Sequence, residues 1–178
     1  MTEFNLTEIP PLGSYVRSVG GVTLSEVTDL NILSVATPQG GAAALEKEFK
    51  KLGLTLVGPG HSMNAKGLRV IGMAADQHFL LSQGDSAPAV KAAYTTDQTH
   101  NWVAIRAEGA AIWAALERLC MLDLHPDAFT VDGALRFDIE TMVALMVKED
   151  ENQVLLLGAA SSAQSSLHAI ETALIAVA

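Results

Sequence analysis

Cysteine is nearly absent from the sequence, which has only Cys120 among its 178 residues. A single cysteine cannot form an intrachain disulfide, so the thiol content does not require an oxidising compartment. The first 20 residues contain no basic region followed by an apolar run, the pattern of a secretory signal. No apolar stretch near either end approaches the roughly 20 residues that a membrane-spanning helix needs. These absences predict a cytoplasmic protein that does not span a membrane.

Basic and aromatic residues are also scarce. The chain has 11 Lys and Arg against 20 Asp and Glu, a formal net charge of −9, and aromatic residues make up only 5%. This balance has the wrong sign for following a phosphate backbone, and the sequence has no stripe of alternating basic and aromatic residues for stacking bases. Nucleic acid is therefore excluded as an expected partner.

Apolar residues are abundant instead, at 49%, whereas charged residues make up 17%. This composition predicts a globular protein with some apolar surface facing another subunit. Residues 1–20 show no sustained period and include Pro10-Pro11, so we expect an N-terminal arm that packs on a partner. Residues 21–178 are expected to form a single globular domain of two pseudo-repeats, at about 21–95 and 96–178.

The first pseudo-repeat is expected to begin with a strand over 31–36 and a helix over 42–52 that ends at Gly53. Two short apolar runs, 68–73 and 79–82, predict a hairpin that turns at residues 74–77. Ser86 is expected to cap a short helix that extends to Ala93.

The second pseudo-repeat follows a similar order. Alternation predicts a strand over 102–107, and apolar spacing predicts a helix over 110–119. Strands are expected over 135–140, 142–147 and 154–157, with a polar turn over 148–153 between the last two, and Ser161 or Ser162 is expected to cap a final helix. The order predicts an α+β fold of duplicated ferredoxin-like halves, β-α-β-β-α repeated.

The glycine and histidine motifs do not predict an active site. Gly58-Pro59-Gly60 lacks the third glycine and the following helix of a nucleotide-binding loop, and Gly60-His61-Ser62 lacks the second glycine of a nucleophile elbow. We interpret both as turns. His78 could be a general base, although a packed or surface histidine is the favoured interpretation. Asp97 and His100 lie close together in a loop, where turn hydrogen bonds from Asp97 explain the spacing.

Cys120, Asp123 and His125 form the densest group of potential ligand atoms in the chain. A metal site needs at least three converging ligands, and this short run supplies a weak signal. We favour a structural role, in which Leu122 and Leu124 enter the core while Asp123 and His125 satisfy turn amides. The sequence therefore predicts no catalytic, cofactor-binding or metal-binding residue on this chain, and the role of these three residues beyond the turn stays open.

The same segment resembles a stretch of the gamma subunit of heterotetrameric sarcosine oxidase, C-P-L-D-L-H-P-x-x-F. The matching residues are Cys120, Leu122, Asp123, Leu124, His125, Pro126 and Phe129. Further similar stretches are Leu68-Arg69-Val70-Ile71, Ala75-Asp76-Gln77 with Leu80-Leu81, Thr96-Asp97-Gln98-Thr99, and Val103 to Ala107. They occur in the family's order and extend from about Gly21 to the C-terminus. Met121 and Ala75 replace prolines, and His78 replaces a tryptophan, so the chain resembles a divergent member in which His78 inherits a packing position.

The resemblance implies a fold similar to the folate-binding barrel of the glycine-cleavage aminomethyltransferases. It implies a small subunit of a complex that oxidises sarcosine to glycine and passes the one-carbon unit to tetrahydrofolate. In that family, FAD, FMN, NAD and the folate site belong to the large alpha and beta subunits, so no cofactor is expected on this chain. The implied partners are these alpha and beta subunits and the small delta subunit.

Two other functions remain open from the sequence. One is a free-standing folate-binding or aminomethyl-transfer protein, which would need an acidic residue and an arginine converging on a central cavity. The other is a structural homodimer, which is also a possible state of the isolated chain.

Overall fold

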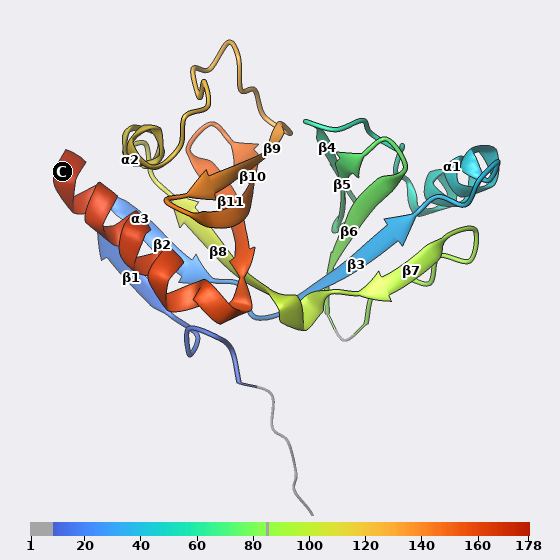
Figure 1. The fold of residues 1–178 in the computed structure, drawn as a ribbon, viewed down its shortest axis with the longest axis horizontal. Helices are drawn as coiled ribbons and strands as arrows, with labels where there is room; N and C mark the ends of the chain where they lie inside the picture. The colour runs from blue at the N-terminus through green and yellow to red at the C-terminus, as the bar shows by residue number, and fades with distance from the viewer. Residues whose placement is uncertain (1–8, 85) are drawn as a thin grey trace, which may run out of the picture.

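The computed structural model describes residues 9–84 and 86–178, which form two antiparallel sheets and three α-helices (Figure 1). The first sheet has the spatial order β4 (Ser62–Ala65), β5 (Leu68–Ala74), β6 (Gln77–Gln83), β3 (Leu30–Ala36) and β7 (Tyr94–Asp97). The second has the order β1 (Val16–Val19), β2 (Val22–Glu26), β8 (Trp102–Glu108), β11 (Gln153–Ala159), β10 (Met142–Asp150) and β9 (Ala134–Ile139). The helices are α1 (Ala42–Leu52), α2 (Ile112–Leu119) and α3 (Ala163–Val177), with 3₁₀ turns η1 (Thr99–Asn101) and η2 (Ala160–Ser162). The predicted α+β class is confirmed.

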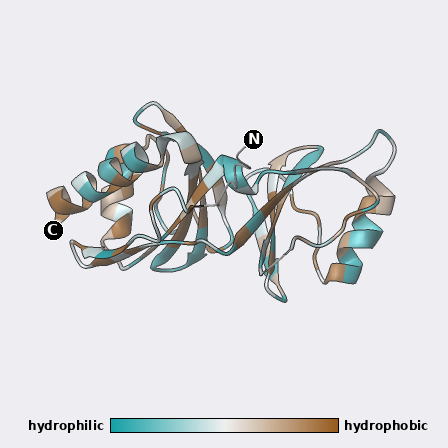
Figure 2. Ribbon diagram, turned by 90° about the horizontal axis from the view of Figure 1, so that it is seen from below, coloured by the Kyte–Doolittle hydropathy of each residue, from teal (hydrophilic) through white to brown (hydrophobic). Residues whose placement is uncertain are grey.

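The elements form four layers, because each sheet packs on the other sheet with one face and on helices with the other. Leu45 and Phe49 of α1 pack on Val35, Val70 and Leu80 of the first sheet. The two sheets meet through a separate apolar cluster, which includes Ile71, Phe79, Leu145, Val147 and Leu157. Helices α2 and α3 cover the far face of the second sheet through Ile112, Leu116, Ile170 and Leu174. Figure 2 shows the result, with helices at the two ends and strands between them.

The two halves share a unit of one strand, one helix and a three-stranded meander. The unit β3-α1-β4-β5-β6 gives the sheet order β4-β5-β6-β3, and the unit β8-α2-β9-β10-β11 gives β9-β10-β11-β8. Among the described residues, only the second unit is followed by a long helix, so the ferredoxin-like pattern expected for each half is not confirmed. The expected boundary near residue 95 falls inside β7, which pairs with β3.

Several local predictions are confirmed. Helix α1 has the predicted bounds, and it ends where Gly53 takes a left-handed conformation (φ 84°) and donates its amide to the carbonyls of Lys50 and Phe49. β5 and β6 form the predicted hairpin. No helix within the described residues is long and apolar enough to cross a membrane.

The predicted helix over 86–93 is wrong. Residues 86–93 form no helix, and the backbone amides of Lys91 and Ala92 donate to the Glu48 carboxylate of α1, at 3.0 and 2.7 Å. Val90 packs in the core beside α1. A carboxylate that accepts from two successive amides holds this segment in an irregular conformation against α1.

The predicted polar turn over 148–153 is also too long. β10 extends to Asp150, and the turn occupies only the two residues before β11. The strand continues because the Lys148 side chain is buried rather than solvated: its Nζ donates to the Phe129 carbonyl at 3.1 Å and lies 5.2 Å from the Trp113 ring centroid.

The described part of the expected N-terminal arm lies on this chain's own second sheet. Val16–Val19 forms β1, which pairs with β2. Leu12 is buried in the core between the second sheet and helices α2 and α3. The amides of Leu12 and Ser14 donate to the two carboxylate oxygens of Glu26, at 2.9 and 2.7 Å. Residues 1–8 of the expected arm lie outside the described residues.

Candidate functional site

His78 is a packed residue, as the sequence predicts. It lies on β6 with 4% of its surface exposed, and its ring is 6.5 Å from that of Phe49. Its Nε2 lies 3.0 Å from the Val57 carbonyl, an acceptor, so Nε2 carries the proton. Burial lowers the pKa of His78 below its ordinary value of 6.5. His78 is therefore neutral and held by structural contacts, which do not suit a solvent-accessible general base.

The segment 120–126 builds a turn. The Asp123 carboxylate accepts the amide of His125 at 2.9 Å, and His125 Nδ1 accepts the amide of Asp127 at 3.3 Å. Both predicted turn roles are confirmed. Leu124 enters the core as expected, whereas the prediction for Leu122 is wrong, since 37% of its surface is exposed.

Cys120 is buried at the end of α2. Across residues 9–84 and 86–178, no three His, Cys, Asp or Glu side chains come close enough together to hold a metal ion.

Asp97 also serves a turn. Its carboxylate accepts the backbone amide of Thr99 at 2.9 Å, and this hydrogen bond lowers the pKa of Asp97. His100 lies in the 3₁₀ turn η1 that leads from β7 into β8. The spacing of Asp97 and His100 thus reflects the connection between the two sheets.

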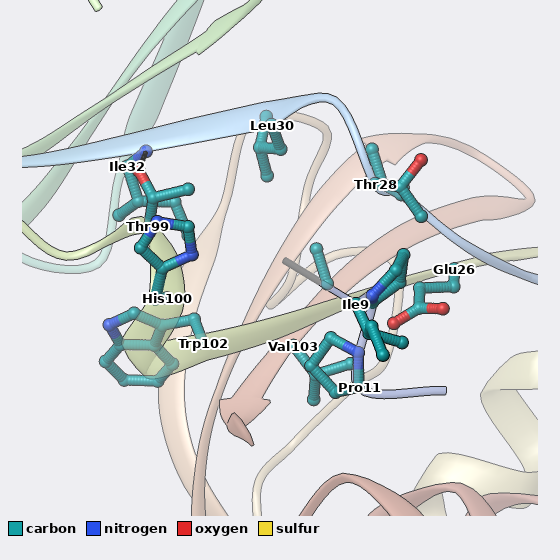
Figure 3. Close-up of a pocket in the computed structure, with 13 residues that line it drawn as sticks. Ile9, Pro11, Glu26, Thr28, Leu30, Ile32, Thr99, His100, Trp102 and Val103 are labelled. Carbon is teal, nitrogen blue, oxygen red and sulfur yellow. Dashed lines mark hydrogen bonds between the residues drawn. The ribbon is translucent and has the colours of Figure 1, made fainter. Parts of the chain in front are cut away.

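A cavity of about 280 Å³ lies at this connection, lined by Ile9–Pro11, β2, β3, η1 and β8 (Figure 3). Its carboxylate, Glu26, already accepts the amides of Leu12 and Ser14. The Thr99 hydroxyl oxygen accepts the amide of Ile32 at 3.1 Å. Glu26 and Thr99 thus hold backbone amides of the chain itself, and neither forms a nucleophile with an adjacent base.

A second cavity, of about 120 Å³, lies between the two sheets and is lined by Arg69 of β5, Arg106 of β8 and Glu149 of β10. Arg106 Nε donates to Glu149 Oε2 at 2.8 Å, and Arg69 Nη2 lies 3.8 Å from Glu149 Oε1. Arg69 Nη1 also donates to Ser62 and to Asp132, at 2.8 and 2.7 Å. We call these three residues, Arg69, Arg106 and Glu149, the intersheet ion cluster.

The intersheet ion cluster connects the two halves and does not have the features of a ligand site. Its charges are paired with one another, and the cavity is smaller than the roughly 300–1,000 Å³ of ordinary ligand pockets. Two backbone hydrogen bonds also connect the two halves. The Ser62 amide donates to the Asp132 carbonyl at 2.6 Å, and the Ala134 amide donates to the Gly60 carbonyl at 3.0 Å. The only sequence signal for this cluster is an arginine inside the apolar run 68–73.

No family model and no curated protein matches the sequence. A solved chain from heterotetrameric sarcosine oxidase of Corynebacterium sp. U-96, in complex with pyrrole 2-carboxylate, superimposes with a TM-score of 0.81 at 22% identity, over 96% of this chain and 97% of that chain. The regulatory subunit of aspartate kinase from Thermus thermophilus gives a TM-score of 0.43 at 12% identity, over 88% of this chain and 99% of that one. The chain therefore shares its fold, over nearly its full length, with a chain of the sarcosine oxidase structure.

Proposed function

We propose that this chain is the small, gamma-type subunit of a heterotetrameric sarcosine oxidase, with a structural and assembly role. The observation that carries the proposal is the fold similarity to a chain of that complex over almost the whole length of both chains. The ordered sequence resemblance supports the same subunit independently of the superposition.

The positions of the similar stretches support this assignment, since each one builds a distinct part of the fold. The stretch from Leu68 to Leu81 is the β5–β6 hairpin, and Thr96 to Thr99 leads from β7 into η1. Val103 to Ala107 is the central part of β8, and Cys120 to Phe129 lies between α2 and β9. Such a distribution is typical of shared architecture rather than of one short chance motif.

A non-catalytic role is supported by the state of the candidate side chains. His78 is neutral and buried, Asp97 and Asp123 each accept a turn amide, and Glu149 is paired with Arg106. In the proposed complex the other subunits hold FAD, FMN, NAD and tetrahydrofolate, oxidise sarcosine to glycine and transfer the one-carbon unit. This chain contributes packing surface, in the cytoplasm.

One observation favours a second candidate, a free-standing folate-binding or aminomethyl-transfer protein. Arg106 and Glu149 converge on the intersheet cavity, which is the kind of arrangement that this function needs. The cavity of about 120 Å³ and the direct 2.8 Å contact between the two side chains disfavour it. Titration of the purified chain with tetrahydrofolate separates the two candidates, because saturable 1:1 binding would support the second.

The test of the first candidate is co-expression with sarcosine oxidase alpha, beta and delta subunits from the same organism, with and without this chain. We expect a complex that contains this chain in one copy, elutes as one species and forms hydrogen peroxide from sarcosine. The purified chain alone is expected to be colourless and inactive. A fully assembled, fully active complex that excludes this chain would contradict the proposal.

A further inference from the structure

The α2–β9 loop, residues 120–132, exposes apolar side chains at the surface of the second half. In Figure 1 it rises beyond α2 and β9. Met121 is completely exposed, and Leu122 and Val131 have 37% and 39% of their surfaces exposed. Two consecutive residues, Met121 and Leu122, are thus both exposed, and methionine is enriched at protein interfaces.

This loop is held in place by its own contacts. Leu124 and Phe129 are buried in the core with 4% and 3% of their surfaces exposed, and the Phe129 carbonyl accepts Lys148 Nζ. The amides of Ala128 and Phe129 both donate to the His125 carbonyl, at 2.9 and 2.8 Å. Because two buried side chains and a hydrogen-bonded turn already order the loop, binding a partner through its exposed side chains costs little further conformational entropy.

The charge of the loop indicates what kind of surface it fits. No lysine or arginine lies between Arg118 and Arg136, whereas Asp123 and Asp127 flank the turn. The Asp127 side chain is 95% exposed. Residues 98–178 as a whole carry 11 acidic against 4 basic residues. A second copy of this chain would set like charges against each other, so charge complementarity favours a basic partner.

We propose that the α2–β9 loop docks into an apolar pocket edged by lysine or arginine on a large subunit of the complex, with Met121 and Leu122 as the inserted side chains. This inference rests on the proposed function and specifies its contact. Acidic residues around an apolar centre then steer association and set the register of the contact.

The test uses the full complex and a double variant, Met121→Ser with Leu122→Ser. We expect its affinity for the large subunits to fall at least about tenfold, equivalent to 1.4 kcal/mol, while its melting temperature stays near that of the wild type. Ile175→Ser is the matched control, because Ile175 is an apolar residue that is 68% exposed on α3, outside the loop. Its binding should stay within about twofold of the wild type.

Charge is tested separately with Asp127→Asn, since this side chain contributes little to the fold. Raising the salt concentration should weaken binding of the wild type more than binding of the variant. If the wild type assembles and the double variant binds as tightly as the wild type, the docking inference is overturned but the proposed function is not. Failure of the wild type to assemble would overturn the proposed function and this contact with it.

Discussion

Gly72 is a residue whose missing side chain determines how two segments meet. It lies in β5, where the backbone of residues 57–58 lies against the strand, and a Cβ at this position would lie 2.1 Å from the Gly58 carbonyl oxygen. A parallel bridge pairs Pro59 with Gly72, and the Gly72 amide donates to the His61 carbonyl at 3.0 Å. The three nearest atoms, Gly58 O, Gly58 C and Val57 O, all belong to backbone, so the site cannot adjust by rotating a side chain.

We therefore expect Gly72→Ala to lower the free energy of unfolding by about 2–3 kcal/mol through overpacking. Gly58→Ala is the matched control, because a Cβ at Gly58 would meet nothing within 4 Å. Urea denaturation of both variants measures the difference. Equal stability of the two would show that residues 57–58 can move away from β5.

His78 links stability to pH. Burial lowers its pKa below 6.5 and outweighs the hydrogen bond to Val57 and the charge of Asp76, which raise it. Below about pH 6.5 the unfolded chain binds a proton at this residue that the folded chain resists. The contribution of His78 to stability is thus fully present above the unfolded pKa and is lost as pH falls.

We expect the free energy of unfolding to decrease between about pH 7 and pH 5 more steeply in the wild type than in His78→Gln, which keeps a donor for the Val57 carbonyl but does not titrate. Chemical denaturation at several pH values measures both slopes. Identical slopes would contradict the assignment, since the remaining histidines are common to both proteins.

At the scale of elements, periodicity predicted the three helices and seven of the described strands, but not β1, β2, β4 or β7. Alternation and apolar runs predict the β5–β6 hairpin, β8 and β9, and spacing with Gly53 predicts both ends of α1. The expected helix over 86–93 is wrong because Glu48, more than 40 residues away, binds its amides. The expected turn over 148–153 is too long because Lys148, besides its ion pair with Glu151, is buried against Trp113 of α2 and the Phe129 carbonyl of the α2–β9 loop. These tertiary contacts override local propensity and are invisible to a local pattern.

The length of β10 gives a testable consequence. We expect Lys148→Met to lower the free energy of unfolding by about 1–3 kcal/mol, since the buried Phe129 carbonyl loses its donor and Trp113 loses its cation. Lys47→Met on the exposed side of α1 is the control and should change stability by less than about 0.5 kcal/mol. A similar cost for both variants would contradict the role assigned to Lys148.

At the scale of the whole molecule, the turn roles of the candidate residues could be predicted from the sequence, whereas the intersheet ion cluster could not. The turn roles of Asp123 and His125 depend on neighbours two residues away, so sequence spacing suffices to infer them. Arg69, Arg106 and Glu149 come from three strands of two sheets, and nothing local relates their positions. Only the topology, which sets β5 opposite β8 and β10, brings them together.

The intersheet ion cluster should therefore stabilise the packing of the two sheets against each other. We expect Arg69→Met to lower the free energy of unfolding by about 3 kcal/mol, because its side chain is 8% exposed and Asp132 and Ser62 lose a buried donor. The cost stays at the lower end for an interrupted buried ion pair, since Glu149 retains Arg106 and Asp132 is half exposed. Arg17→Met is the matched control: this arginine is 65% exposed and pairs with Glu171, so its loss should cost less than about 1 kcal/mol. Urea denaturation, monitored by circular dichroism and by tryptophan fluorescence, measures the free energy of unfolding of both variants. A loss no larger for Arg69→Met than for Arg17→Met would contradict an electrostatic connection between the sheets.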